Sequence, residues 1–342
     1  MGRKPTINAN LPKHMRKRVK PSGKTYYYLD TGGKPRKEIP LGDDYILALK
    51  KYSEMNIAAT MVAVTMGDVL RRYITEELPK LATNTIRIQL SDVKHLQKYF
   101  SDAPLDQVKP VHINKFLDKN RDKPTTANRC KRLFSTVWNH ARKWGYTDLP
   151  NPCTGIQGHK LQKRTIYITD EVFSLVRQHA SEPLRDALDL AYLTGQRPAD
   201  TLSMTAHDIV DGHLIVTQAK TLQPLRIIIQ GKLLDLIDRI EKRKTTHKIC
   251  TAALLVNMQG KRLTKAVLRK HFDAAKKSAA EASPDMAQAV KEFWFYDLRA
   301  KAADDTADDR GEQAASHLLG HDSVKTTQRH YLRRGKKVEP TR

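Results

Sequence analysis

The chain has 342 residues, of which 39% are hydrophobic, and a formal net charge of +24. This length predicts two or three domains, and the hydrophobic content is sufficient for packed cores, which argues against a chain that is disordered throughout. The excess of Lys and Arg is spread along the whole sequence and indicates a polyanionic partner. By itself it leaves DNA, RNA and an acidic membrane surface open, and an ordinary solvated basic surface is the alternative.

The sequence predicts neither a metal site nor a membrane segment. Cys130, Cys153 and Cys250 have the spacing of neither a zinc site nor a disulfide framework, which predicts reduced thiols in a cytosolic protein. The thirteen histidines do not cluster at ligand spacing. We see no apolar run near the roughly 18 residues of a membrane span, and the first ten residues lack the apolar stretch of a signal peptide.

Residues 1–56 are predicted to form a small basic domain. Prolines disfavour a helix in the first 22 residues, where we expect a flexible arm. Strands at Tyr26–Leu29 and around 37–41, with a turn at Asp30–Gly33, predict a hairpin, and a helix follows from Asp43 or Asp44. At least one tyrosine of the run 26–28 is expected to pack against this helix. The candidates for contact with the polyanion are Lys24, Lys34, Arg36 and Lys37.

Residues 65–152 are predicted to form a helical domain. Apolar side chains recur at helical spacing over 84–100, and a second helix extends to Gly145, with Thr125 or Thr126 as its N-cap. A boundary follows at Asn151-Pro152. One face of the second helix carries basic side chains that either contact phosphates or form a solvated face, and a basic linker follows the boundary. These residues are Arg129, Lys131, Arg132, Arg142 and Lys143 on the helix, and Lys160, Lys163 and Arg164 in the linker.

Residues 165–342 are predicted to form a mixed, mainly helical domain. Thr169 or Asp170 caps a first helix, and a buried helix over 184–194 ends at Gly195. A stretch rich in β-branched residues follows and predicts two strands around a turn that contains Pro224. Further helices are expected near 231–243, 264–280, 286–305 and 312–319.

Four short patterns in this last domain stand in a suggestive order. Arg197 and Asp200 follow the helix that ends at Gly195, Lys220 lies in the hairpin, Tyr296-Asp297-Leu298-Arg299 comes next, and Leu318-Leu319-Gly320-His321 is followed ten residues later by Tyr331. Each pattern alone is typical of an ordinary surface or core position. Only their order and spacing together point to one site.

This order resembles that of the tyrosine recombinase family, which includes the phage integrases. The segment LLGHDSVKTTQ at 318–328 is the most specific local match. The segment PSGKTYYYLDTGGKPRKEIPLGDD resembles the arm-type DNA-binding domain of lambda-type integrases, a three-stranded sheet that enters the major groove, and the block 65–150 resembles their core-binding domain. The resemblance covers nearly the whole chain and implies a multi-domain α+β fold that is mainly helical.

The resemblance also implies an activity and partners. The expected function is that of a site-specific recombinase, an integrase that cleaves and rejoins double-stranded DNA through a 3′-phosphotyrosine intermediate. It would integrate or excise a phage or mobile element in the cytoplasm of a bacterial host. The expected partners are DNA attachment sites, a homotetramer on that DNA, a DNA-bending host protein and an excision factor. The few residues after Tyr331 are candidates for docking on a neighbouring protomer.

The resemblance implies a role for each site residue. Planar arginine forks suit the charged phosphate oxygens, the lysine suits protonation of the leaving 5′ oxygen, and the tyrosine suits in-line attack on phosphorus. Because the covalent link stores the bond energy, neither a metal nor another cofactor is expected. The assignments are Tyr331 as nucleophile, Arg197 and Arg299 on the phosphate, Lys220 as acid, His321 at the phosphate or the nucleophile, and Asp200 as support for Arg197.

Two positions depart from the family pattern. Tyr296 stands where the family has His or Lys, and a phenol can donate to a phosphate but is a poorer proton carrier at neutral pH. Tyr331 is one residue further from His321 than is usual, and His330 takes the usual place. We predict that Tyr331 is the nucleophile and that Tyr296 is a member of the pocket. The alternatives are a DNA-binding protein without strand transfer and a type IB topoisomerase.

Overall fold

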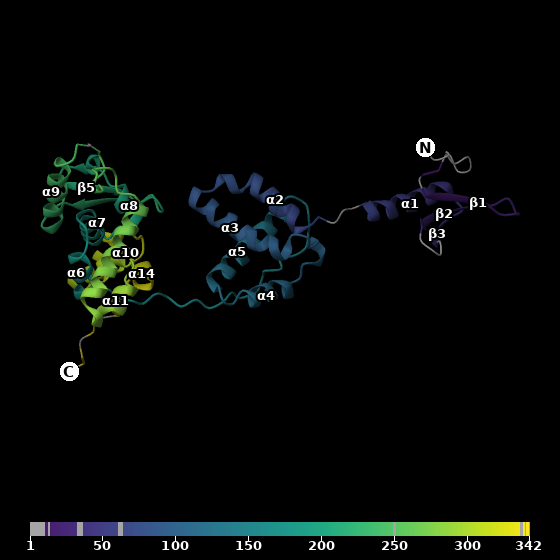
Figure 1. Cartoon of the computed structure of the whole chain (residues 1–342). Helices are drawn as coiled ribbons and strands as arrows, with labels where there is room; N and C mark the ends of the chain where they lie inside the picture. Colours follow the sequence, from purple (N-terminus) through teal and green to yellow (C-terminus); the bar gives the residue numbers. More distant parts are fainter. Residues whose placement is uncertain are drawn as a thin grey trace. The chain divides into compact units, whose positions relative to one another are not determined.

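The computed structural model describes residues 11–12, 14–32, 37–60, 64–248, 251–335, 338, 340 and 341. Lys34, Arg36 and Cys250 lie outside these residues. The chain divides into two compact units, Met1–Gln162 and Lys163–Arg342, and each is described by itself (Figure 1). Among the described helices, none is long and apolar enough to cross a bilayer. The described residues also contain no group of three or more His, Cys, Asp or Glu side chains placed to hold a metal ion.

The N-terminal part is a three-stranded antiparallel sheet followed by a helix. The strands β1 (Met15–Val19), β2 (Thr25–Gly32) and β3 (Lys37–Gly42) pair in that order, and α1 (Tyr45–Thr60) follows. Met15, Leu41 and Ala48 form a small core against which Tyr27 packs, so the prediction of a packed tyrosine is confirmed. Lys24 and Lys37 are exposed.

The flexible arm predicted for residues 1–22 is wrong for residues 15–19. This segment is strand β1, in which Met15 pairs with Leu29 and Val19 with Thr25. Its order comes from the ladder with β2 and from burial of Met15, which is 3% exposed. Neither contact can be recognised from the proline-rich local sequence. The predicted hairpin is confirmed, and α1 extends past the predicted end near residue 56.

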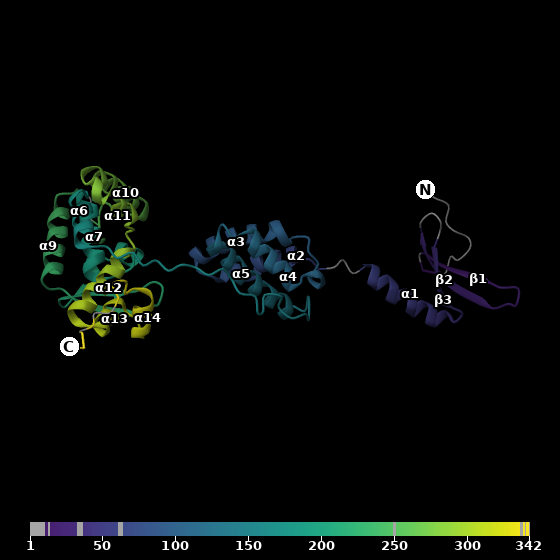
Figure 2. The same cartoon turned by 90° about the horizontal axis from the view of Figure 1, so that it is seen from below.

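The rest of the first unit is a helical bundle (Figure 2). Its helices are α2 (Met66–Glu76), α3 (Thr83–Phe100), α4 (Pro110–Lys119) and α5 (Pro124–Lys143), with short 3-10 turns at Leu78–Lys80 and Leu105–Gln107. Phe134 and Trp138 of α5 are fully buried at its core. The predicted N-cap at Thr125 or Thr126 is wrong: the N-cap is Lys123, because the ring of Pro124 is already set for helical φ and begins the helix there. Gly145 follows the helix in a left-handed conformation, as predicted.

The second unit packs helices around a small sheet. Its elements are α6 (Asp170–Gln178), α7 (Glu182–Thr194), α8 (Pro198–Ser203), a 3-10 turn (Ala206–Asp208), β4 (Ile209–Val210), β5 (His213–Thr217), β6 (Pro224–Ile228), α9 (Lys232–Thr245), α10 (Lys265–Ala282), a 3-10 turn (Pro284–Met286), α11 (Ala287–Glu292), α12 (Asp297–Arg310), α13 (Glu312–Leu319) and α14 (Val324–His330). The strands form an antiparallel sheet in the order β4-β5-β6. Helices α7 and α12 lie inside the unit, surrounded by the others (Figures 1 and 2).

Three predictions for this unit need correction. The single helix expected over 286–305 is two helices, α11 and α12, because the chain turns inward at Phe293, which is fully buried. Pro224 is the first residue of β6 and does not lie in the turn, a place where the missing N–H of proline is tolerated. Helix α14 was not predicted, since its sequence VKTTQRH has no apolar period, and it is held by burial of Thr327.

Candidate active site

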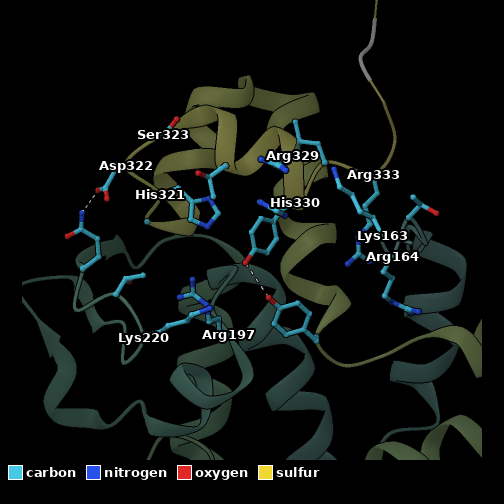
Figure 3. Close-up of a pocket in the computed structure, with 18 of the residues that line it drawn as sticks. Lys163, Arg164, Arg197, Lys220, His321, Asp322, Ser323, Arg329, His330 and Arg333 are labelled. Atoms are coloured by element: carbon cyan, nitrogen blue, oxygen red, sulfur yellow. Dashed lines mark hydrogen bonds between the residues drawn. The ribbon is translucent and has the colours of Figure 1, made fainter. Parts of the chain in front are cut away.

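A basic cavity of about 1020 Å³ opens on the second unit (Figure 3). It gathers Arg197, Lys220, Tyr296, His321 and Tyr331, five of the residues that the sequence singled out. Lys163 and Arg164 of the predicted linker also line it, together with Arg329, His330 and Arg333 from the end of the chain. The cavity therefore combines a surplus of cations with two phenols and two imidazoles.

Arg299 lies directly behind the cavity and is only 1% exposed. Its Nη1 donates to the carbonyl of Gly195 at 2.8 Å, and its Nη2 donates to the carbonyl of Leu319 at 2.8 Å. Gly195 and Gly320 end α7 and α13 in left-handed conformations, which turns these carbonyls inward. The guanidinium is thus fixed between two helix ends, while its buried Nε has no hydrogen-bond partner among the residues that the structure describes.

Arg197 begins the turn into α8 and reaches the cavity from the other side. Its Nη1 donates to Oε1 of Gln218 at 2.8 Å, whereas Oδ2 of Asp200 lies 3.9 Å away. Oδ1 of Asp200 accepts a hydrogen bond from the backbone N–H of Ala219 at 3.0 Å. The predicted supporting carboxylate therefore holds the hairpin more closely than it holds Arg197.

Gln218 is a residue that sequence reasoning did not select. It is fully buried, and its Nε2 donates to Oε1 of Gln196 at 2.8 Å and to the carbonyl of Leu319 at 2.9 Å. Its Oε1 is the acceptor for Arg197. One amide side chain thus joins the strand end, the turn after α7 and the end of α13. The available signal in the sequence was its place two residues before Lys220.

His321 is held in one tautomer by its two neighbours. Its Nε2 lies 3.3 Å from Nη2 of Arg299, and its Nδ1 lies 2.8 Å from Oγ1 of Thr327. Because arginine can only donate, Nε2 accepts and Nδ1 carries the proton. Burial, followed by the charges of Arg299 and Arg197, lowers the pKa of His321 to about 4. The imidazole is therefore neutral near pH 7, with its basic nitrogen toward the arginine.

Tyr331 ends α14 with its ring inside the site. Its hydroxyl lies 3.2 Å from the hydroxyl of Tyr296, its ring centroid lies 5.0 Å from that of His321, and Cζ of Arg299 lies 5.2 Å from its centroid. Burial pushes the pKa of Tyr331 upward, but the hydrogen bond with Tyr296 and the charge of Arg299 outweigh burial and bring it below its ordinary value. Burial raises the pKa of Tyr296 to about 12. The arrangement favours Tyr331 as the phenol that ionises.

Lys220 approaches from the connection between β5 and β6. It lines the cavity and is exposed, on the side away from Arg164 and Arg333 (Figure 3). A hydrated ammonium on a flexible stem suits a group that must move toward a substrate oxygen.

Residues 166–337 match the family model described as the phage integrase family. The chain belongs to the phage integrase family. The integrase of Enterobacteria phage 434 is 25% identical over 324 residues, which cover 87% of this chain and 88% of that relative. The integrase of Escherichia phage lambda is 24% identical and covers 87% of this chain and 88% of its own length.

Solved structures show the same fold. A lambda integrase tetramer bound to a Holliday junction superposes with a TM-score of 0.70 at 21% identity, and covers 97% of this chain and 99% of that chain. The Tn1549 transposon integrase in complex with transposon right end DNA gives a TM-score of 0.65 at 16% identity over 78% of this chain and 95% of that chain. This family member is accordingly a tyrosine recombinase of the lambda-integrase type, an enzyme that breaks and rejoins DNA. The predicted family and fold class are confirmed.

Several of the basic residues that the sequence offered for DNA contact are committed to internal contacts in this recombinase. Arg129 makes a two-point ion pair with Asp92, at 2.7 and 2.6 Å. Lys131 donates to the carbonyl of Ile156, and Arg164 pairs with Asp297 at 2.6 Å. The remaining residues are exposed, namely Arg132, Arg142, Lys143, Lys160 and Lys163.

Proposed function

We propose that this recombinase carries out site-specific recombination with Tyr331 as its nucleophile. The observation that carries the proposal is the position of the Tyr331 hydroxyl, which faces a basic cavity beside Arg299, His321 and Tyr296. The domain division that we propose is an arm-type DNA-binding domain at 1–56, a core-binding domain at 65–152 and a catalytic domain at 165–342. Relatives solved on core-site DNA support this division.

The first step is attack of the Tyr331 oxygen on the scissile phosphorus. The bond from Tyr331 to phosphorus forms, the bond from phosphorus to the 5′ oxygen breaks, and a 3′-phosphotyrosine results. Nε2 of His321, the acceptor nitrogen of the imidazole, takes the phenol proton, and Arg299 keeps its two contacts with the helix ends. Arg299 and Arg197 neutralise the charge that develops on the non-bridging oxygens. We propose Gln218 and Asp200 as the residues that orient Arg197 and the hairpin.

Lys220 completes the first step by protonating the leaving 5′ oxygen, so a 5′-hydroxyl is released. The second half of the reaction reverses the first. The 5′-hydroxyl of another strand then attacks the phosphotyrosine, the bond to Tyr331 breaks, and the phenol recovers its proton. The covalent intermediate conserves the phosphodiester energy, so this scheme consumes neither a nucleotide nor an oxidant. Tyr296 donates to the Tyr331 oxygen or, once the phosphate is bound, to a phosphate oxygen.

The partners we propose are the DNA attachment sites of a phage or mobile element in the cytoplasm of a bacterial host. A homotetramer would hold two duplexes, as supported by the lambda integrase tetramer on a Holliday junction. A DNA-bending host protein and an excision factor complete the proposal. Exposed basic residues contact the phosphates, with Lys24 and Lys37 in the arm-type domain and Arg132, Arg142, Lys143, Lys160 and Lys163 further along.

A nicked suicide duplex tests the proposal. A core site is first selected by binding of the full chain from a random DNA pool and is then nicked so that the released 5′ end diffuses away. We expect a covalent protein–DNA adduct with the wild type and none with Tyr331→Phe, while both bind the duplex equally. An adduct with Tyr331→Phe would refute the nucleophile.

The adduct assay, together with plasmid relaxation and recombination assays, separates the alternatives. Tight binding by the wild type without any adduct would indicate a DNA-binding protein that has lost strand transfer. Relaxation of supercoiled plasmid without site preference would indicate a type IB topoisomerase. Recombination between two copies of the selected site is the result that we expect.

A further inference from the structure

A buried carboxylate at the start of α12 lies between two residues of the proposed site. Asp297 directly follows Tyr296, precedes Arg299 by two residues, and has a fully buried side chain. Its Oδ1 accepts from Nε of Arg164 at 2.8 Å and from Nη1 of Arg333 at 2.8 Å. Its Oδ2 accepts from Nη2 of Arg164 at 2.6 Å and from the backbone N–H of Trp294 at 2.8 Å. Both oxygens are therefore shared between two arginines and the backbone that leads into α12.

The first arginine comes from the segment that enters the unit. Arg164 is the second residue of the unit that begins at Lys163. Besides its two contacts with Asp297, its Nη2 donates to the carbonyl of Glu292, and its Cζ lies 4.1 Å from the ring centroid of Trp294. This guanidinium therefore attaches the entering segment to the turn between α11 and α12.

The second arginine comes from the segment that follows the nucleophile. Arg333 lies two residues after Tyr331, and its side chain is 7% exposed. Its Nη1 donates to Asp297 and, at 2.6 Å, to the carbonyl of Ile166, while its backbone N–H donates to Oδ1 of Asp304 at 2.9 Å. The chain just past the nucleophile is thus fastened to its own unit. The expected docking of this segment on a neighbouring protomer is not needed to place Arg333.

Arg164 is bonded to one acceptor of the Arg333 side chain and is close in the chain to the other. It orients the Asp297 carboxylate by a two-point ion pair, and it lies two residues from Ile166, whose carbonyl is the other acceptor. Figure 3 shows Arg164 and Arg333 on the same side of the pocket. Displacement of the entering segment would therefore remove the Ile166 carbonyl from Arg333 and, with Arg164, the two-point contact that orients the Asp297 carboxylate.

We propose that Arg164, Asp297 and Arg333 form a clamp through which the segment entering the catalytic unit sets the position of Tyr331. The three are positioning residues, since they act on the reaction through Tyr331. This inference rests on the proposed role of Tyr331 as the nucleophile. Its consequence is that a force on the entering segment, such as DNA bound on both sides of it, changes the position of Tyr331 and so the rate of its attack.

Trypsin digestion of the full chain without DNA tests the clamp directly. With the clamp closed, the bonds after Arg333 and Arg334 are protected, since both backbone N–H groups are bonded to Asp304. We expect Arg164→Ala to speed cleavage at these bonds at least tenfold, as followed by mass spectrometry. Arg239→Ala is the matched control, because it removes an arginine from the buried carboxylates Asp186 and Asp189 in the same unit and should leave the tail protected.

Single-turnover adduct formation at saturating nicked duplex is the second readout. We expect Arg164→Ala to slow it about tenfold beyond any change in DNA affinity, and Arg239→Ala to leave it within twofold. Arg164→Lys keeps the charge but not the two-point contact, so it should show the same release if Arg164→Ala does not fold. If both Arg164 variants kept the bonds after Arg333 and Arg334 protected from trypsin and formed the adduct at the wild-type rate, the clamp would be overturned. An adduct with Tyr331→Phe would instead overturn the nucleophile and leave the trypsin result standing.

Discussion

The hydroxyls of Tyr296 and Tyr331 lie 3.2 Å apart, so the two phenols share one hydrogen bond. Burial raises the pKa of Tyr296 to about 12, whereas the pKa of Tyr331 lies below its ordinary value because the Tyr296 hydrogen bond and Arg299 outweigh burial. The two titrate as a pair, and the pair loses its first proton from Tyr331. Tyr296 therefore acts on the proposed nucleophile as well as on a bound phosphate, which gives a physical role to the residue that departs from the family pattern.

Tyr296→Phe should shift the pH dependence of adduct formation to higher pH. Without the donor the pKa of Tyr331 rises, so a smaller fraction is phenolate on the acidic side of the profile. A hydrogen bond to a charged group is worth roughly 1.5 kcal/mol, which corresponds to about a tenfold slower rate near pH 7. Single-turnover rates from pH 6 to pH 10 measure the shift. Equal profiles for the variant and the wild type would contradict the role, and Tyr26→Phe in strand β2 is the control.

Gln218→Ala should slow adduct formation without weakening DNA binding. The buried amide is the acceptor for Arg197 and joins it to Gln196 and Leu319, so its loss removes a partner from each and frees the guanidinium. Misplacement of one phosphate-binding group costs on the order of tenfold to a hundredfold in rate. Gln223→Ala is the control, since the half-buried amide of this residue lies on the same hairpin but donates to Asp322 at 2.6 Å. Equal rates for the two variants would argue against an orienting role.

Local signals in the sequence predicted much of the site. Gly195 ends α7 in a left-handed conformation as expected, and Arg197, Lys220, His321 and Tyr331 meet at one cavity as their order implied. Helix ends and pattern residues are recognisable because their chemistry depends on neighbours in the chain.

What the sequence could not predict depends on distant partners. Gln218 meets Leu319, which is 101 residues away, and Arg129 meets Asp92, which is 37 residues away. Strand β1 exists through pairing with β2, and α14 has no apolar period. In each case a buried polar contact or a pairing of strands that forms only on folding decides the structure. The local sequence propensities do not predict such contacts.

The stability of the second unit should fall as the pH is lowered from about 6.5 to about 4. The pKa of His321 is lowered to about 4 in the folded chain by burial and by Arg299 and Arg197, so the unfolded chain binds the extra proton first. The contribution is fully present above the unfolded pKa and amounts to at most about 3 kcal/mol, less after screening by solvent. The melting temperature of wild type and His321→Gln at pH 7.5 and pH 5 measures it. The variant should lose less stability between the two, and His179→Gln, an exposed histidine of the same unit, should behave as the wild type does.

Thr327→Val should slow adduct formation about fivefold, whereas Thr327→Ser should not, because a single neutral hydrogen bond of about 1 kcal/mol is lost only in the first. Oγ1 of Thr327 accepts from Nδ1 of His321 at 2.8 Å, and its carbonyl accepts the backbone N–H of Tyr331 at 2.8 Å. Valine keeps the shape and the backbone contact but leaves the imidazole free to change tautomer. Similar rates for the Val and Ser variants would show that the tautomer is held by Arg299 alone.

Arg129→Ala and Arg132→Ala should distinguish a basic residue of α5 that stabilises the fold from one that contacts DNA. Arg129 pairs at two points with Asp92, which is 1% exposed, whereas Arg132 of the same helix is exposed. Removal of one partner from a buried pair leaves an uncompensated charge and costs about 3–5 kcal/mol, so Arg129→Ala should lower the melting temperature of the helical part.

Arg132→Ala should leave that melting temperature unchanged and weaken DNA binding instead. Loss of one phosphate contact reduces the slope of log affinity against log salt concentration by about 1. Fluorescence anisotropy on a labelled duplex at several salt concentrations measures the slope, and calorimetry measures melting. Arg87→Ala is the control, since Arg87 is exposed on α3 and donates to Asn84, so its loss removes one charge without a predicted DNA contact. The opposite result would be an unchanged slope for Arg132→Ala and a reduced slope, at full stability, for Arg129→Ala. It would mean that Arg129 leaves Asp92 when DNA binds and contacts a phosphate itself.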